Sequence, residues 1–373
     1  MEPTANTTVE NGVKLFAYPA TPQQQQLWFL DELCAGTPAY DIPLAYDVRG
    51  ILDMDALDQS LRWMVNRHET LRTVFSFRAE EPSQIVRSEV SIAFVRVDLS
   101  DTPETEKEAT CRRIVADEAA FRFNLAKGPL IRGGLLKLDA ARHLVIFNFH
   151  HITLDHLSVL QFAREFWVAY DCFHKGQILS LEPPAMHYPA FATWQKRKIE
   201  QADFQSDLQN WVQTLKSVKQ SPTFPPDHPS PLNYSFTGKQ VSFSMTPDLS
   251  ATIRAFAGTS KKSLDVTLLT LFKCLLARYS GEDDVVVGTP FANRSIAGAQ
   301  GLMGCCMNTL PVRSKLADAQ NFREALEVAH QAILAASSRE RVPLKLIVDA
   351  LNPDRSTVVD PLFHCTFTVQ APP

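Results

Sequence analysis

The stretch from His143 to His156, "HLVIFNFHHITLDH", joins an apolar run to a cluster of ionisable side chains. The run has the composition of a β-strand, in which successive side chains point to opposite faces. One face of the strand carries Val145, Phe147, Phe149 and His151. The other face carries Leu144, Ile146, Asn148 and His150. Because both faces are mostly apolar, the run predicts an interior strand that is covered on both sides.

The end of this strand carries the candidate chemistry. His150 and His151 are expected to point in opposite directions, so the two are not expected to do the same job. Asp155 follows four residues after His151 and stands before an apolar-periodic run that extends to about His174. An aspartate in that place is a good N-cap for a helix.

Strand and helix patterns alternate in both halves of the chain, which predicts an α/β fold of two lobes with related build. Strands are expected at Ile42–Gly50 and Lys239–Met245, for example, and a long helix at Leu264–Tyr279. We expect residues 1–17 to be disordered, residues 18–183 to form the first lobe, and residues 184–373 to form the second. The second lobe ends directly after a strand-like segment, so its last elements are expected to be missing.

Composition limits the classes of partner and compartment. A formal net charge of -4, with no Lys/Arg-rich tract among aromatic residues, argues against nucleic acid as a partner. No apolar run reaches the roughly 18 to 20 residues that span a bilayer, and the start has no signal-peptide pattern. Seven scattered cysteines without a CxxC pair are typical of a reduced, cytoplasmic protein.

Three interpretations of the histidine cluster remain open on these residues alone. The first is structural, with histidines that end a strand and an aspartate that caps a helix. The second is a dinuclear zinc site of the HxHxDH type, but Thr153 then stands where a histidine ligand is needed, and no metal is expected. The third is acyl transfer, in which a neutral imidazole assists an amine that attacks a thioester.

The motif "HHITLD" resembles the HHxxxDG signature of nonribosomal peptide synthetase condensation domains, which belong to the chloramphenicol-acetyltransferase-like superfamily. Other motifs of that family have similar counterparts in the same order along the chain. These are "TPQQQQLWFL" (21–30), "RHETLRTVF" (67–75), "YPAFATWQ" (188–195), "VVVGTPFANR" (285–294), "GLMGCCMNTLPVR" (301–313), "RERVPLKLI" (339–347) and "VDPLFHCTFTVQ" (359–370). The chain is therefore identified as a member of this family from about residue 18 onward.

The resemblance implies a V of two acetyltransferase-like lobes, with mixed sheets packed with helices, around a central tunnel. Carrier proteins would insert phosphopantetheine arms from opposite faces, and no cofactor would be bound directly. His151 would assist attack by an amine, or less often a hydroxyl, on an acyl or peptidyl thioester, with His150 beside it. Asp155 would be mainly structural and would pair with Arg294. The expected partners are acyl or peptidyl carrier proteins and neighbouring synthetase or synthase domains, with no nucleic acid or membrane.

Two departures from the family pattern leave an alternative open. His156 stands where the motif has glycine, so an imidazole would line the site beside the thioester. The chain also lacks the segment that usually follows the last motif. In this respect the chain resembles the truncated condensation domains of reducing polyketide synthases of the lovastatin and compactin type. Such a domain would bind, shape or help release a carrier-tethered chain without forming an amide.

Overall fold

The computed structural model describes residues 6–10, 12–33, 38–78, 81–218, 223–227, 238–351 and 362–370. The chain forms two compact units. The first holds the described residues up to Ile199 together with Arg294–Cys306, and the second holds those of Glu200–Asn293 and those from Met307 onward. The sequence placed the boundary at residues 183 and 184 instead. Helix α5 (Tyr188–Ile199) packs in the first unit, because Tyr188 and Phe191 are buried against the segment Arg294–Cys306.

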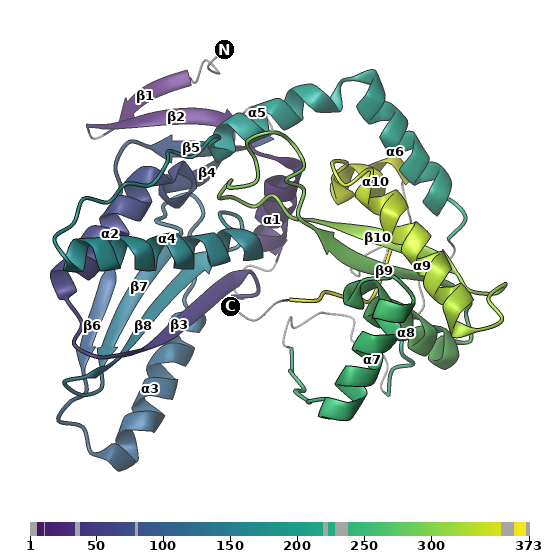
Figure 1. Cartoon of the computed structure of the whole chain (residues 1–373). Helices are drawn as coiled ribbons and strands as arrows, with labels where there is room; N and C mark the ends of the chain where they lie inside the picture. The colour runs from purple at the N-terminus through teal and green to yellow at the C-terminus, as the bar shows by residue number, and fades with distance from the viewer. Residues whose placement is uncertain are drawn as a thin grey trace. The chain divides into compact units, whose positions relative to one another are not determined.

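The first unit contains a four-stranded sheet in the order β3-β8-β7-β6. Strand β6 runs parallel to β7, and the other pairs are antiparallel. Helices α2 and α4 cover one face of this sheet and α3 covers the other (Figure 1). The bounds are β3 (Asp41–Arg49), α2 (Met54–Arg67), β6 (Phe94–Asp98), α3 (Glu104–Ala119), β7 (Ile131–Lys137), β8 (Arg142–His150) and α4 (His156–His174).

Strand β8 has two buried faces, as its alternation predicts. Phe147 packs against Phe166 of α4 with ring centroids 4.9 Å apart, and Phe149 packs against Phe162 at the same separation. On the opposite face, Ile146 joins a cluster with side chains of α3. The strand ends at His150, so His151 lies in the turn that follows.

A second sheet of the first unit has the order β1-β2-β5-β4. The sequence predicted disorder for residues 1–17. For the described residues this prediction is wrong, because strands form at residues 6–10 and 13–19. Strand β2 pairs with β5 over Leu15–Pro19. Residues 1–5 and 11 lie outside the described part of the chain. The bounds are β1 (Asn6–Glu10), β2 (Val13–Pro19), α1 (Pro22–Leu33), η1 (Glu69–Arg72), β4 (Thr73–Arg78) and β5 (Glu81–Arg87).

The second unit has helices around an antiparallel pair of strands, β9 and β10. A single parallel bridge joins Gly288 of β9 to Thr366. None of the helices in the described residues is both long and apolar enough to cross a membrane. The bounds are α6 (Ala202–Leu215), α7 (Pro247–Thr259), α8 (Leu264–Ser280), β9 (Asp284–Phe291), β10 (Asn308–Lys315), α9 (Phe322–Ser337) and α10 (Leu344–Leu351).

The strand predicted at Lys239–Met245 is wrong. The segment pairs with no strand among the described residues, and Val241 and Phe243 are 87% and 83% exposed. Alternation of apolar and polar residues is enough to suggest a strand, but a strand also needs a neighbour to receive its backbone hydrogen bonds.

Candidate functional site

The turn between β8 and α4 is held by a hydrogen bond at almost every residue. The carbonyl of His150 accepts from the backbone N–H of Thr153 at 3.0 Å and from its hydroxyl at 2.8 Å. The backbone N–H of His151 donates to the carbonyl of Tyr40 at 2.8 Å. Gln24 of α1 donates to the carbonyl of Ile152 at 3.4 Å. These bonds give His151 a defined place at the end of the sheet.

His150 faces away from the phenylalanine core and is 2% exposed. Its Nδ1 accepts a hydrogen bond from the backbone N–H of Ile152 at 3.1 Å, and its Nε2 lies 3.6 Å from Oδ1 of Asp31. Its ring also makes an edge contact with Phe123. His150 therefore supports the turn from the inside. The contact with Asp31 had no signal in the sequence.

His151 is half-buried in the turn, with its Nδ1 4.0 Å from Sγ of Cys305. Burial lowers the pKa of His151, although a hydrogen bond with its own backbone and the charge of Asp155 act in the opposite direction. The imidazole is therefore mostly neutral near pH 7 and has a lone pair that can accept a proton.

Asp155 and Arg294 form a buried, bidentate ion pair. Nη1 of Arg294 donates to Oδ2 of Asp155 at 2.9 Å, and Nη2 donates to Oδ1 at 2.8 Å. The aspartate is fully buried, and the arginine side chain is 7% exposed. The pairing expected from the family motif is thus present in the first unit, although 139 residues separate the two partners along the chain.

Both carboxylate oxygens of Asp155 also accept hydrogen bonds from groups other than Arg294. Oδ1 accepts from the backbone N–H and the hydroxyl of Ser158 at 2.9 Å each, and the bond from the backbone N–H caps α4 as predicted. Oδ2 accepts from the backbone N–H of Cys306 at 2.9 Å. These bonds and the ion pair with Arg294 commit both carboxylate oxygens to donors of the protein. Asp155 therefore fixes the segment Arg294–Cys306 against the start of α4.

Gly304 and Tyr188 bring that segment close to His151. A Cβ on Gly304 would lie 1.9 Å from Cδ2 of Tyr188, so only glycine fits at this approach. The hydroxyl of Tyr188 donates to the carbonyl of Cys305 at 2.7 Å. The closeness of Cys305 to His151 was not foreseen, because nothing in the motif indicates where its side chain points.

The two adjacent cysteines are both buried. Burial and the charge of Asp155 raise the pKa of the Cys305 thiol, and burial raises the pKa of the Cys306 thiol. Both are therefore protonated at neutral pH, when a thiol is a weak nucleophile. Both side chains belong to the buried cluster around Tyr188 and Phe191, which indicates a packing role. In the described part of the chain, no three His, Cys, Asp or Glu side chains gather as a metal-binding group.

His156 is the first residue of α4 and is half-buried. It directly follows the capping aspartate, so its backbone belongs to the helix and its place near the turn is set by the cap. Its expected effect on the substrate side of the site stays a prediction.

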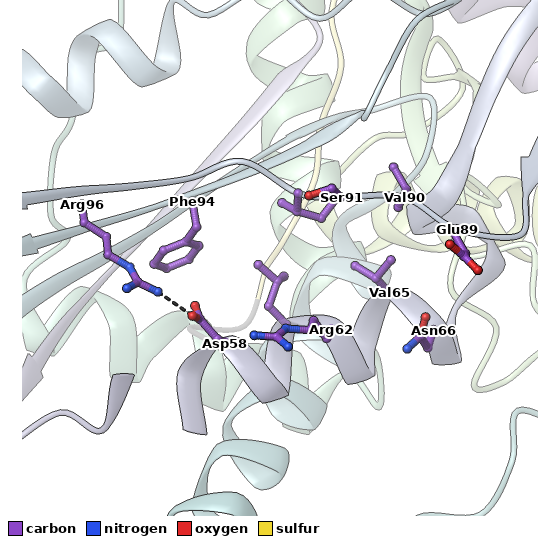
Figure 2. Close-up of a pocket in the computed structure, with 11 residues that line it drawn as sticks. Asp58, Arg62, Val65, Asn66, Glu89, Val90, Ser91, Phe94 and Arg96 are labelled. Carbon is purple, nitrogen blue, oxygen red and sulfur yellow. Dashed lines mark hydrogen bonds and ion pairs between the residues drawn. The ribbon is translucent and has the colours of Figure 1, made fainter. Parts of the chain in front are cut away.

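A separate pocket of about 600 Å³ lies between α2 and residues 89–96 of the first unit. Figure 2 shows an ion pair at one end of it, where Arg96 donates to Asp58 at 2.5 Å. Leu61, Val65 and Phe94 give it an apolar floor. None of the residues of the histidine turn lines this pocket, so it has no part in the chemistry considered for His151.

Comparison with protein families finds a match over residues 15–373 to the family described as "Condensation domain". A linear gramicidin synthase of Brevibacillus parabrevis is 33% identical over 354 residues, which is 95% of this chain and 5% of that protein. The phosphinothricin tripeptide synthetase of Streptomyces viridochromogenes is 30% identical over 352 residues, or 94% of this chain and 32% of that protein. The chain thus spans less than a third of the length of either relative.

Two solved structures have a similar fold. The match to the X-domain from teicoplanin biosynthesis covers 93% of this chain and 76% of the X-domain chain, with a TM-score of 0.82 and 22% identity. The match to the first condensation domain of the calcium-dependent antibiotic synthetase covers 90% of this chain and 77% of that domain's chain, with a TM-score of 0.75 and 19% identity. These similarities agree with the two-lobed α/β fold class expected from the sequence.

Proposed function

The chain belongs to the condensation-domain family, a family of acyl-transferring enzymes, and from this we propose that it joins an acyl or peptidyl thioester on one carrier protein to an amine on another. The observation that carries the proposal is the environment of His151. Its imidazole is half-buried and kept neutral at the end of β8, while the nearby carboxylate of Asp155 is committed to Arg294.

The reaction needs no covalent intermediate on the protein. The amine nitrogen attacks the thioester carbonyl, the carbon–nitrogen bond forms and the carbon–sulfur bond breaks. The lone pair of His151 accepts or orients the proton that the amine loses, and that proton neutralises the departing thiolate. The lowered pKa of His151 keeps this lone pair available near neutral pH.

In this scheme three further residues would act by holding the site in place around His151. They are His150, Asp155 and Arg294. His150 supports the turn through its bond with Ile152, and the ion pair between Asp155 and Arg294 holds the segment that carries Cys305 beside His151. An offset of about 1 Å between reacting groups costs up to a hundredfold in rate. Loss of the ion pair would therefore reduce activity without removing the base.

The substrates would be presented on phosphopantetheine arms of carrier proteins. The two relatives compared with this chain are called a synthase and a synthetase, and both are much longer than it is. We infer that acyl or peptidyl carrier proteins and neighbouring synthetase domains are the partners. An amine is the expected acceptor, and a hydroxyl is the less frequent one.

The test compares the chain with His151→Ala. A donor carrier protein is loaded with an acyl-phosphopantetheine, amine and hydroxyl acceptors are supplied, and products are followed by intact-mass spectrometry. We expect His151→Ala to lose at least about a hundredfold in rate, the usual range for a positioned proton acceptor. His174→Ala, at the far end of α4, is the matched control and should keep wild-type activity.

Equal product from the wild type and His151→Ala would refute the role of His151. Absence of product from every protein, together with measurable binding of the loaded carrier, would favour the alternative domain that binds and shapes a tethered chain.

A further inference from the structure

The segment Arg294–Cys306 is tied to α4 at two points that follow one face of the helix. At the first point, the hydroxyl of Ser158 accepts a hydrogen bond from the backbone N–H of Gly304 at 2.9 Å. At the second, the side-chain amide of Gln161 donates to the carbonyl of Gly301 at 2.8 Å. Residues three apart lie on the same face of a helix. Because the two glycines are also three residues apart, the segment runs along this face in the direction opposite to α4.

The amide of Gln161 fits between its neighbours in one orientation only. Its Nε2 donates to the carbonyl of Gly301 and also to Oε1 of Glu165, at 2.9 Å, four residues further along α4. A carbonyl and a carboxylate both accept hydrogen bonds, and the amide nitrogen has two N–H groups to donate. The oxygen end of the amide could satisfy neither of them. Glu165 therefore orients the amide that holds Gly301.

Glu165 is itself held by the motif "RHETLRTVF" (67–75), for which the sequence indicated no role in the chemistry. Its Oε2 accepts from Nε of Arg67 at 3.0 Å and from Nε2 of His68 at 2.7 Å. Burial acts to raise the pKa of Glu165, but hydrogen bonds from His68 and Gln161 and the charges of His68 and Arg67 lower it to about 2. Glu165 is therefore ionised at neutral pH, and the motif supports the amide of Gln161 through this carboxylate.

The tie at Gly301 bears on the site because the same segment carries Cys305, whose Sγ lies 4.0 Å from Nδ1 of His151. We propose that Gln161 is a positioning residue, which holds the carbonyl of Gly301 against α4 and thereby keeps in place the segment that flanks His151. It would act through that segment, without contact with the substrate. This inference rests on the proposed function for its effect on rate, but its effect on the segment does not depend on any activity.

Three variants separate the donor from the size of the side chain. Gln161→Leu removes both hydrogen bonds at a similar size, whereas Gln161→Lys keeps N–H donors that can reach the same acceptors. Gln209→Leu is the matched control, since it makes the same substitution at an exposed position of α6. Gln161 is half-buried, so its replacement should be tolerated. Gln161→Ala replaces Gln161→Leu if the leucine variant does not fold.

The first measurement is the rate at which iodoacetamide alkylates Cys305 and Cys306 in the native protein, followed by peptide mass spectrometry. Both thiols are buried, so they react only when the segment opens. Loss of one net hydrogen bond should raise this rate about fivefold in the leucine variant. The lysine variant and the control should keep the wild-type rate. Cys111 and Cys172, free and half-buried elsewhere in the first unit, are internal references.

Each outcome of the alkylation decides a separate point. An unchanged rate at Cys305 and Cys306 in the leucine variant would overturn the proposal. An equal rise at Cys111 and Cys172 would also overturn it, because the loosening would then not be confined to the segment. A lysine variant as reactive as the leucine variant would refute the role of the donor.

The second measurement is the steady-state rate of amide formation. We expect Gln161→Leu to lower kcat about fivefold with KM within about twofold, because the substrate contacts remain while the surroundings of His151 shift. Gln161→Lys should recover to within about twofold of the wild type, on the same reasoning. A wild-type kcat in Gln161→Leu would refute the positioning role. If the wild type itself forms no amide, the proposed function fails, and the alkylation rates still decide whether Gln161 holds the segment.

Discussion

The two compact units each bury a basic side chain, and they compensate its charge in different ways. In the first unit, Arg294 meets the carboxylate of Asp155 in a bidentate pair and also donates to the carbonyl of Leu302. In the second unit, Lys273 of α8 is fully buried and donates to the carbonyl of Val312 at 2.8 Å and to the hydroxyl of Ser314 at 2.7 Å. Both of these acceptors are neutral.

The comparison shows what a buried cation requires to stay charged. An arginine beside a carboxylate keeps its charge because attraction and hydrogen bonds offset the loss of water. A lysine with neutral acceptors loses the solvation of its charge without a counter-charge. Burial accordingly lowers the pKa of Lys273 to about 7. The first unit therefore depends on a charge pair, whereas the second should prefer an uncharged amine.

The largest effect is expected from Arg294→Met. The substitution leaves the buried carboxylate of Asp155 without its counter-charge, so the free energy of unfolding should fall by about 3 to 5 kcal/mol. Urea unfolding followed by circular dichroism measures it. Arg112→Met is the control, since Arg112 and its partner Glu108 are both 76% exposed and their pair should contribute less than about 0.5 kcal/mol. A loss below about 1 kcal/mol for Arg294→Met would mean that the pair is replaceable.

A pH dependence is expected from Lys273. Between about pH 7 and 10.5, the unfolded chain holds a proton on Lys273 that the folded chain does not. The unfolded state therefore binds more protons, and stability should rise with pH by up to about 1.4 kcal/mol per unit in this window. The measurement is the difference in unfolding free energy between the wild type and Lys273→Met across that range. A difference that does not change with pH would show that Lys273 keeps its proton when buried.

The smallest effect is expected from Ser314→Ala. The variant removes one of the two neutral acceptors of Lys273, so it should lower the free energy of unfolding by about 1 kcal/mol at pH 7. It should also move the pH dependence of Lys273 to lower pH, because the charged amine then has fewer partners. Ser244→Ala, on an exposed segment, serves as the control. A shift to higher pH would mean that the Ser314 hydroxyl does not stabilise the charged amine.

Local patterns were enough to predict the elements that carry the site. The alternation of residues 144–150 predicted a strand with two buried faces, and β8 has them. Asp155 before an apolar-periodic run predicted the cap and start of α4, which begins at His156. These predictions succeed because alternation and capping depend on residues a few positions apart.

The same kind of pattern failed at Lys239–Met245. Its alternation is as regular as that of a strand, yet Val241 and Phe243 are exposed and the segment has no strand beside it among the described residues. The burial of Lys273 was equally invisible, because lysine within an apolar helix can point either to solvent or to the core. Pairing and burial depend on segments that are distant in sequence.

By itself, the sequence determined the family, through its ordered motifs, and the local geometry at the end of β8, through alternation and capping. The family resemblance also indicated Arg294 as the partner of Asp155, but no local pattern could have done so across the 139 residues between them. The tertiary structure alone decided that Asp31 faces His150, that Cys305 lies beside His151 and that Lys273 is buried. The physical reason is that side-chain contacts and desolvation arise only when distant segments pack together, whereas strand alternation and helix capping are set by near neighbours in the chain.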